Sequence, residues 1–528
     1  MAKILDCTLR DGGYINRFRF GAATMTDIVD RLSKASIDIV ECGFLQENAG
    51  DSESSLFSNV ESIKRIIQKK YSNTMYVAMI QIGAIDIDSI APCSGESIDG
   101  IRLTFHEHEI EEAFVFAKQL KEKGYRVFIQ PVGTIGYTDE ALLQLVERVN
   151  ALMPYAFYIV DTLGTMYKKD VLRMFHLVND NLDAAICMGF HAHNNIQLSF
   201  ANAQELLEVC GNREMILDAS VFGMGRGAGN LNTELITQYI NDNLGYRYDM
   251  TQILEIMDLY IKPLSLQYQW GYDAPYYISS ASGCHPNYAS FLINKQTLRV
   301  QDIYGILNNL APEERHLFNK AYIEKQYMMF MDRHVDDTRA AEKAHNMVAD
   351  KKVLLLAPGK SINTPETVKK IKQLAERENC VTIAVNFVPE NIPVDMVFVS
   401  NMKRFESMER LRAGTRQTIV VTSNILQESS DNVLVVDYMR HTNQNPCVFD
   451  NAGLMCMHFM QRVGAEEVYL AGFDGFKANA RENFYNESMY ANAEQERMAN
   501  LNEAMKEQIT QLRNHIPITF ITQSHYES

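Results

Sequence analysis

Two short stretches of the 528-residue chain combine residue types that bind divalent metals in enzymes. The first, RDGGY at 10–14, places a cation and a carboxylate beside two glycines that let the backbone turn. The second, HAHN at 191–194, separates two histidines by one residue. Side chains at i and i+2 of a strand point the same way, so both imidazoles can share a metal with a carboxylate from another strand. Asp11, His191 and His193 are therefore candidate metal ligands; the simpler alternative is polar residues that cap a strand end.

A third stretch, GMGRGAGN at 223–230, is rich in glycine and opens into a predicted helix over 231–242. Backbone N–H groups at a helix N-terminus bind anions, so the loop is a candidate anion site. A flexible turn is the alternative, because a glycine run alone is weak support for a binding site.

The elements that must position these residues are short β-rich runs alternating with amphipathic helical patterns. Eight strands are predicted, at 3–10, 37–44, 75–81, 100–104, 126–132, 156–162, 185–193 and 216–223. Eight strands in about 225 residues, each followed by a helix, are typical of a (β/α)8 TIM barrel, in which catalytic residues lie at the C-terminal ends of strands. A doubly wound open sheet is the alternative.

Beyond the barrel, the pattern changes twice. Residues 246–345 are predicted to form a helical extension and linker, since they are rich in Tyr, Met and Gln and poor in β signal. Seven further strand patterns then alternate with helices, which predicts a Rossmann-like α/β domain with a parallel sheet over 346–528. The predicted barrel domain spans 1–245.

Composition excludes several classes of protein. The chain is 46% hydrophobic and 22% charged, as in ordinary globular proteins, and its net charge of −16 argues against nucleic acid or an anionic membrane as partner. The nine cysteines never form a CxxC pair, and no apolar run approaches the roughly 18 residues of a membrane span. A cytoplasmic enzyme acting on a small molecule is the expectation.

The three motifs, in this order and spacing, resemble the DRE-TIM metallolyases, and within them the 4-hydroxy-2-oxovalerate aldolases, over roughly residues 1–300. The resemblance implies magnesium or manganese bound by Asp11, His191 and His193, with Asn230 as a possible further ligand. It also implies that Arg10 stabilises the enolate oxygen of a 2-oxo acid. Asp6 would support the site without binding the metal.

One position departs from the aldolase pattern. Those aldolases carry a histidine shortly after the aspartate, where this chain has Tyr14, and a phenol with its ordinary pKa near 10 is a poor base. A metal-bound hydroxide, His106 or His285 is left as the candidate base. The stretch NYASFL at 287–292 resembles an aldolase segment and marks Tyr288 as the candidate acid. Gln81, Asp161 and Thr162 could contact the substrate.

In the second domain, the first strand runs into Gly359, Lys360 and Ser361, but Leu354 occupies the place of the first glycine of a Walker A motif. These three residues could still hold an anion at a helix N-terminus, or simply form a βα turn. The later pattern NAGL at 451–454 and Asp474 weakly resemble the hydroxymethylpterin diphosphokinase-like proteins. That resemblance implies a nucleotide or sugar-nucleotide site.

Three functions remain open from the sequence. The first is a metal-dependent aldolase that cleaves or forms a bond between a pyruvate-type 2-oxo acid and an aldehyde. The second is an acyl-CoA-dependent condensing transferase on the same metal site, although the GMGRGAGN loop lacks the catalytic cysteine of hydroxymethylglutaryl-CoA lyase. In the third, the C-terminal domain is a non-catalytic docking or nucleotide- or sugar-binding module, as in polysaccharide biosynthesis. A homodimer is a further expectation.

Overall fold

A computed structural model describes residues 2–245, 247–295, 297–409, 417–477, 483–484 and 495–527. The chain divides into two compact units. The first comprises Met1–Ser290 together with Ala311–Phe318, and the second comprises Phe291–Leu310 together with Asn319–Ser528. The chain therefore leaves the first unit, returns to it for eight residues, and leaves again. The predicted extension at 246–345 is divided between the two units.

The first unit contains a closed parallel barrel, as predicted. Its strands are β1 (Ala2–Asp6), β2 (Ile39–Leu45), β4 (Met75–Gln81), β5 (Gly100–Phe105), β6 (Arg126–Pro131), β7 (Ala156–Asp161), β8 (Cys187–Ala192) and β9 (Met215–Ala219). They pair in the order β1-β9-β8-β7-β6-β5-β4-β2, and β1 also pairs with β2, which closes the barrel. This closure excludes an open doubly wound sheet. A two-residue strand, β3 (Leu56–Phe57), extends β2.

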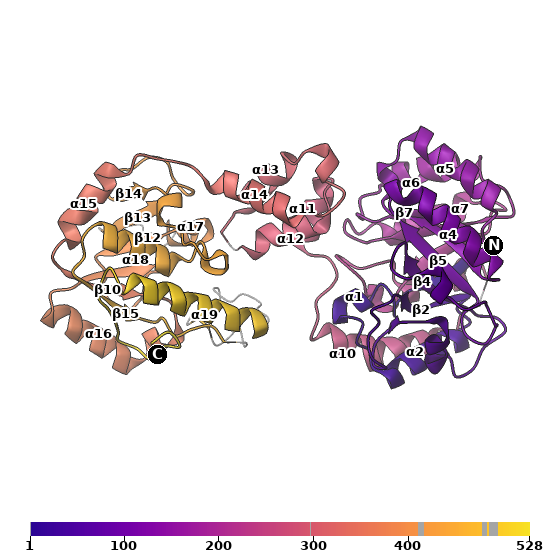
Figure 1. The fold of residues 1–528 in the computed structure, drawn as a ribbon, viewed down its shortest axis with the longest axis horizontal. Coiled ribbons are helices and arrows are strands. Elements are labelled where there is room, and N and C mark those ends of the chain that lie inside the picture. Colours follow the sequence, from indigo (N-terminus) through magenta and orange to yellow (C-terminus); the bar gives the residue numbers. More distant parts are fainter. Residues whose placement is uncertain are drawn as a thin grey trace. The chain divides into compact units, whose positions relative to one another are not determined.

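Helices surround the strands (Figure 1). The long ones are α2 (Ala22–Lys34), α4 (Ile110–Glu122), α5 (Asp139–Leu152), α6 (Lys168–Asn179), α7 (Ser199–Val209) and α8 (Thr233–Asn243). The helix expected after β2 is the one-turn α3 (Val60–Ile63), and the helix expected after β4 is replaced by a 3-10 turn, Ile87–Ser89. The polar, glycine-containing runs at 46–59 and 91–100 favour loops there.

Side chains alternate between the barrel interior and the helix-covered outside. On β5, Ile101, Leu103 and Phe105 join the outer core, so the intervening Arg102 points inward. On β8, the inward Gly189 has no room for a Cβ, which would lie 2.3 Å from the ring of Tyr158. The same alternation turns Glu41, Asp218 and His191 inward, so charged groups occupy the barrel interior above an apolar layer.

Short helices follow the barrel. They are α9 (Met250–Ile256), α10 (Lys262–Ser265), α11 (Ala274–Ala281), α12 (Pro286–Asn294), α13 (Val300–Asn308), α14 (Lys320–Met331) and α15 (Thr338–Val348). A π-helical turn, Met257–Ile261, joins α9 to α10. The one-turn α1 (Gly13–Asn16) lies at the start of the barrel. In the part of the chain that the structure describes, no helix is both long enough and apolar enough to cross a membrane.

The second unit contains the predicted parallel sheet, with strand order β14-β13-β12-β11-β10-β15-β16. The strands are β10 (Lys352–Leu356), β11 (Val381–Val385), β12 (Met396–Val399), β13 (Thr418–Thr422), β14 (Val433–Val436), β15 (Glu467–Ala471) and β16 (Ile518–Phe520). The strand order reverses between β10 and β15. Ligands of doubly wound sheets bind at such a switch point, outside the carboxyl ends of the strands.

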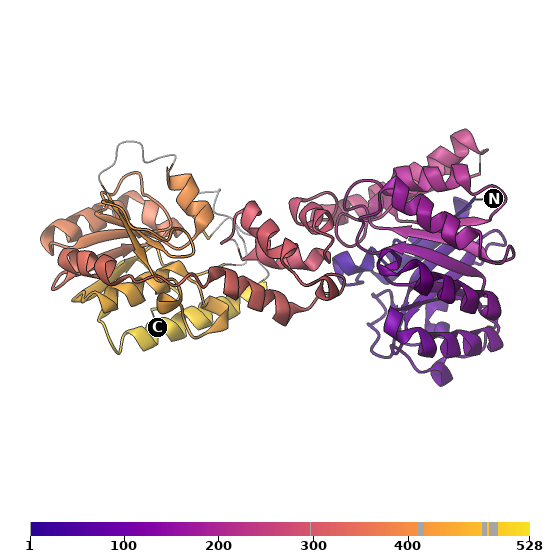
Figure 2. The same ribbon diagram turned by 90° about the horizontal axis from the view of Figure 1, so that it is seen from above.

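Helices lie on both faces of this sheet (Figure 2). One face packs Leu354 and Leu356 in a core shared with α16 (Pro365–Arg377) and α17 (Met402–Glu409). On the other face, Phe398 contacts α18 (Ala452–Arg462), which packs against α19 (Gln495–Leu512). Each unit therefore has its own hydrophobic core.

Candidate active site

The three predicted metal ligands lie together at the C-terminal end of the barrel. Asp11 follows β1 in a tight turn, in which its N–H donates to Cys7 O at 2.8 Å. His191 is an inward residue of β8, and His193 follows that strand. The ligand atoms of the three side chains lie within 4.8 Å of one another, and all three residues are buried. The structure thus brings together what two distant motifs predicted.

The atoms left unpaired in this cluster suit a metal. Asp218 Oδ2 lies 2.9 Å from His191 Nδ1, which leaves Nε2 of that ring for a metal. His193 Nδ1 and Asn230 Oδ1 are buried and have no hydrogen-bond partner among the described residues. Asn230 Nδ2 instead donates to Asp11 Oδ2 at 2.8 Å, which places Asn230 beside the cluster. Two imidazoles, a carboxylate and an amide oxygen form a donor set that a divalent cation accepts.

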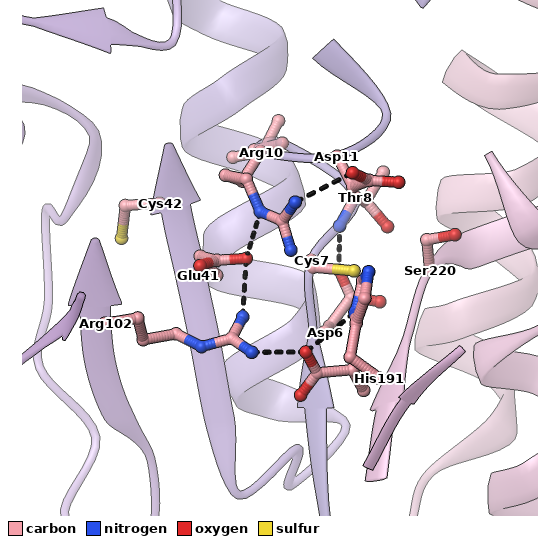
Figure 3. Close-up of polar contacts among 12 residues, drawn as sticks. Asp6, Cys7, Thr8, Arg10, Asp11, Glu41, Cys42, Arg102, His191 and Ser220 are labelled. Atoms are coloured by element: carbon pink, nitrogen blue, oxygen red, sulfur yellow. Dashed lines mark hydrogen bonds and ion pairs between the residues drawn. The ribbon is translucent and has the colours of Figure 1, made fainter. Parts of the chain in front are cut away.

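A chain of buried charges connects the cluster to the barrel interior (Figure 3). Arg10 donates from NH1 to Asp11 Oδ1 at 2.7 Å and from Nε to Glu41 Oε2 at 2.8 Å. Arg102 NH1 also lies 2.8 Å from Glu41 Oε2, and NH2 of Arg102 donates to Asp218. Asp218 in turn holds His191. Asp11 and His191 are therefore each oriented by a residue that further ion pairs hold in place.

The charges along this chain do not balance. It holds three carboxylates (Asp11, Glu41 and Asp218) and two guanidinium groups, and the five side chains are at most 4% exposed. Buried charge without compensation is costly, and one negative charge remains once the pairs are counted. A bound cation removes this cost, which is a second reason that the site fits a metal.

The protonation states also favour metal binding. Burial raises the pKa of Asp11, but the positive groups around it, Arg10 first among them, together outweigh burial and hold the pKa well below its usual range. Burial lowers the pKa of His193 to about 3, despite the attraction of Asp11. Near neutral pH, Asp11 is therefore ionised and His193 neutral, as metal ligands must be.

The glycine-rich loop at 223–230 packs directly on the cluster. A Cβ on Gly225 would lie 2.3 Å from Asn230 Nδ2 and 2.6 Å from Asp11 Oδ2. The N–H of Ala228 donates to Asn195 Oδ1 at 2.9 Å, so it is not available to an anion. The loop thus allows close packing around the candidate ligands. Its one cationic residue is Arg226, whose guanidinium carbon lies 4.4 Å from the centroid of the Tyr14 ring.

A cavity of about 260 Å³ opens beside the cluster. Its wall includes Arg10, His191 and His193. Arg10 NH2 and Gln130 Nε2 are buried there and have no hydrogen-bond partner among the described residues. The remaining lining residues are Tyr14, Phe44, Met79, Gln81, Thr104, Phe105, His106, Val132, Val160, Thr162, Arg226, His285, His316, Leu317 and Phe318. Two residues of the cavity wall therefore carry buried donors that no described residue uses.

The other predicted substrate contacts divide into two groups. Tyr14, His285, Gln81 and Thr162 line the cavity, as does His106. Asp161 does not, because its carboxylate accepts the N–H groups of Thr165 and Met166, both at 3.0 Å. Asp6 lies away from the cavity wall and accepts from Thr8 N and Thr233 Oγ1.

Tyr288, predicted as the acid, is fully buried and is not part of the cavity wall. Its hydroxyl oxygen lies 2.7 Å from the carbonyl oxygens of both Glu314 and Leu317. In the structure, therefore, Tyr288 anchors the segment Ala311–Phe318. A short motif match could not show this, because the anchored segment follows more than twenty residues later.

Sequence reasoning missed Glu41, Arg102 and Asp218. The signal was present, since each is a lone charged residue inside an apolar strand run, IVECGF, GIRLTF or MILDA. A charge in such a run must find a partner, and three such strands in one barrel predict that the charges meet inside it. His316 and Gln130 were also missed, and only the assembled fold reveals them.

The second unit has a larger cavity, of about 630 Å³, at the switch point of its sheet. Its wall combines aromatic rings (Phe473, Phe476, Phe484 and Tyr526) with polar groups (Asn386, Asp450, Asn451 and Asp474). Of the predicted anion-binding residues, Gly359 lines this cavity, but Lys360 and Ser361 do not.

The N–H groups of that turn are already used. Gly359 N donates to Gly472 O at 3.1 Å, and Ser361 N donates to Asp474 Oδ2 at 2.8 Å. Ser361 Oγ donates to the same carboxylate. Asp474 thus stands where an anion would bind, and the interpretation of Gly359, Lys360 and Ser361 as an anion site has no support in this geometry.

Comparisons with known proteins agree with the barrel site. The HMGL-like family matches residues 1–259. Oxaloacetate decarboxylase of Mycobacterium tuberculosis is 27% identical over 241 residues, covering 44% of this chain and 68% of that protein. A 4-hydroxy-2-oxovalerate aldolase of Geobacillus genomosp. 3 is 27% identical over 272 residues, covering 50% of this chain and 77% of that protein. The HMG-CoA lyase structure from Brucella melitensis is 17% identical, covers 50% of this chain and 98% of that one, and has a TM-score of 0.40.

A buried Asp/His/His cluster at the C-terminal end of a barrel, in a chain with relatives so named, supports a metal-dependent lyase. The first 259 residues belong to the HMGL-like family. The predicted DRE-TIM resemblance is thereby confirmed for the barrel, while the resemblance of the C-terminal domain stays a prediction.

Proposed function

We propose that the barrel is an aldolase that cleaves or forms the carbon–carbon bond between a pyruvate-type 2-oxo acid and an aldehyde. One observation carries this: the Asp11, His191 and His193 cluster lies beside a small cavity lined by Arg10, whose buried NH2 has no hydrogen-bond partner among the described residues. The two relatives reported above are named for different substrates, a 4-hydroxy-2-oxo acid and oxaloacetate. In both, the bond that breaks leaves a pyruvate enolate.

Asp11, His191 and His193 would hold Mn²⁺ or Mg²⁺, with Asn230 Oδ1 as a further ligand. A divalent cation there supplies a Lewis acid that stabilises negative charge on the oxygens of a 2-oxo acid.

Arg10 is the residue of this chain suited to the enolate oxygen. Its Nε and NH1 are held by Glu41 and Asp11, so the guanidinium cannot rotate away, and NH2 is left for a substrate. A fixed donor in a buried site stabilises charge that develops in the transition state without the cost of reorganisation. Gln130 Nε2 offers a second donor, suited to the substrate carboxylate.

The central test replaces both histidines, His191→Ala together with His193→Ala, and measures metal content by elemental analysis and pyruvate release from a panel of 4-hydroxy-2-oxo acids and oxaloacetate. Loss of metal and at least a 100-fold drop in turnover are expected. The matched control is His176→Gln, on the exposed face of α6, which should leave both unchanged. Unchanged metal content in the double variant contradicts the site, and thiol release from acetyl-CoA without any cleavage favours the condensing transferase instead.

We further propose that the second unit binds a small organic ligand, with nucleotides and sugar nucleotides as the first classes to test. The cavity at the switch point supports this, since 630 Å³ lies within the usual range of ligand pockets and a doubly wound sheet binds at that place. The aromatic wall suits a planar ring. With the Gly359–Ser361 turn occupied by Asp474, phosphate groups would have to lie elsewhere in the cavity.

A further inference from the structure

The group that takes the substrate's hydroxyl proton is the open question of the proposed aldolase. Tyr14 occupies the position where the related aldolases have a histidine, and its ring is held by Phe18 and Phe44 on its edges and by the guanidinium of Arg226. Besides the metal-ligand pair, the cavity wall contains three histidines: His106, His285 and His316. A neutral imidazole accepts a proton only at the nitrogen that does not already carry one, so the hydrogen bonds of each ring decide its role.

His106 begins a 3-10 turn, and the N–H of Glu109 donates to its backbone carbonyl oxygen at 2.9 Å rather than to its ring. The His106 ring stacks on the ring of His108, with centroids 5.8 Å apart. His106 is therefore the alternative base, with one face of its ring covered by a second imidazole.

His285, in contrast, accepts a hydrogen bond at its ring. Its Nδ1 accepts the N–H of Asn287 at 3.2 Å, which leaves the proton of the neutral ring on Nε2. Burial, with a contribution from the Arg226 charge, lowers the pKa of His285 to about 4, so the ring is neutral at ordinary pH. His285 thus presents an N–H to the cavity and suits an acid or a hydrogen-bond donor.

His316 differs from His285, whose Nδ1 is used, and from His106, because no ring stacks on His316 in the described part of the chain. Within the described part of the chain, no hydrogen bond fixes either of its ring nitrogens, so a neutral His316 can present a lone pair to the cavity. The backbone that carries it is nevertheless firmly held. Tyr288 Oη contacts Glu314 O and Leu317 O at 2.7 Å, and His285 N donates to Arg315 O at 2.8 Å. These contacts attach Ala311–Phe318 to the barrel unit on both sides of His316.

We propose that His316 is the general base of carbon–carbon cleavage and that Tyr288 is its positioning residue. The inference rests on the proposed aldolase function. An imidazole nitrogen of His316 takes the proton of the substrate's C4 hydroxyl, and the O–H electron pair becomes the carbonyl bond of the aldehyde. The C3–C4 bond breaks, its electron pair forms the enolate of pyruvate, and that enolate takes a proton at C3 from water. The imidazolium returns its proton to solvent, so atoms and charge balance.

Two reactions of the same protein distinguish removal of the hydroxyl proton from formation of the enolate. Cleavage of a 4-hydroxy-2-oxo acid needs the hydroxyl proton removed, whereas exchange of the pyruvate methyl protons with D₂O forms the enolate without that step. His316→Gln should lower kcat for cleavage by about 10²–10⁴-fold, as expected for the loss of a general base. Exchange, followed by proton NMR, should stay within about threefold of the wild type. Added imidazole should restore part of the cleavage in His316→Ala.

Tyr288→Phe keeps the ring that packs on Phe318, with centroids 5.2 Å apart, and removes only the anchoring hydroxyl. It should lower kcat for cleavage about tenfold at an unchanged KM, and imidazole should not rescue it, since the base is still present. His176→Gln on the outer helix α6 is the matched histidine control and should cleave as the wild type does. Unchanged metal content and thermal midpoint show that each variant is folded.

Cleavage by His316→Gln within about threefold of the wild type overturns the assignment, and so does an equal loss of cleavage and exchange. Absence of both reactions in the wild type has a different meaning: it defeats the proposed aldolase function and the base with it. Exchange without cleavage of any 4-hydroxy-2-oxo acid also defeats both, because an aldolase of this kind must cleave such an acid. Unimpaired cleavage by His316→Gln, beside an active wild type, defeats the base alone.

Discussion

The carboxylate of Glu41 lies between two guanidinium groups, those of Arg10 and Arg102. Through Arg10 it fixes the orientation of Asp11, and through Arg102 that of Asp218 and His191. Two candidate metal ligands, one after β1 and one on β8, are thus oriented by one acidic residue. The motifs predicted the three candidate ligands, and the structure brings them together, but the groups that orient them are scattered over β2, β5 and β9.

The substitution Asp218→Asn tests this orientation. The amide keeps the shape of the side chain, but it removes the charge that pairs with Arg102 and that strengthens His191 as a ligand. Loss of such a supporting group costs about 10–100-fold in metal affinity, which titration of the metal-free protein with Mn²⁺ measures. Asp183→Asn, at an exposed loop, is the control. Equal Mn²⁺ affinity in Asp218→Asn and the wild type contradicts the role assigned to the chain of charges.

At the scale of elements, the strand patterns predicted the barrel because each inward position alternates with an outward apolar one. His191 and His193 were located well for this reason, since both belong to the end of one strand. The loops were harder to predict. The glycine run at 223–230 looked like an anion site, whereas its glycines are required because the backbone passes directly against Asp11 and Asn230.

Gly225→Ala should therefore weaken metal binding although no metal-ligand residue is substituted. Its Cβ would lie within 2.3 Å of Asn230 and 2.6 Å of Asp11, so one of the two must move. We expect at least a tenfold weaker metal affinity in the same Mn²⁺ titration. Gly305→Ala, in α13, is the matched control, because nothing lies within 4 Å of the added methyl group. That change should leave metal affinity intact and stabilise the helix by about 0.5–1 kcal/mol. Full metal affinity in Gly225→Ala would show that the loop has more freedom than its contacts indicate.

At the scale of the whole molecule, composition and periodicity predicted two α/β parts, and the structure contains both. They could not predict that Ala311–Phe318 belongs to the barrel while its neighbours in sequence do not. Such a return depends on contacts between residues far apart, such as Tyr288 with Leu317, and leaves no periodic pattern. The sequence also could not predict that Asp474 accepts hydrogen bonds from the turn at Gly359–Ser361, because Asp474 lies more than a hundred residues further along the chain.

Separate cores predict separate responses to ligands. Calorimetric scans of the full chain should show two unfolding transitions. Mn²⁺ at 100 times its Kd should stabilise the barrel unit by about 2.7 kcal/mol and should raise the midpoint temperature of the barrel transition alone. A ligand from the nucleotide and sugar-nucleotide panel should raise the midpoint temperature of the other transition alone. Phe473→Ala, in the wall of the second cavity, is expected to abolish the second shift and to spare the first. A panel without any effect on the second transition would favour the docking alternative.

The membership of Ala311–Phe318 in the barrel unit limits how the gene can recombine and where the protein can be truncated. Because the chain passes between the units three times, no single crossover in its gene exchanges one complete unit for another. A barrel cut off after Ser290 loses His316, and one extended to Phe318 carries twenty residues that belong to the other unit. A single cut in this chain therefore either removes His316 from the barrel or leaves foreign residues attached to it.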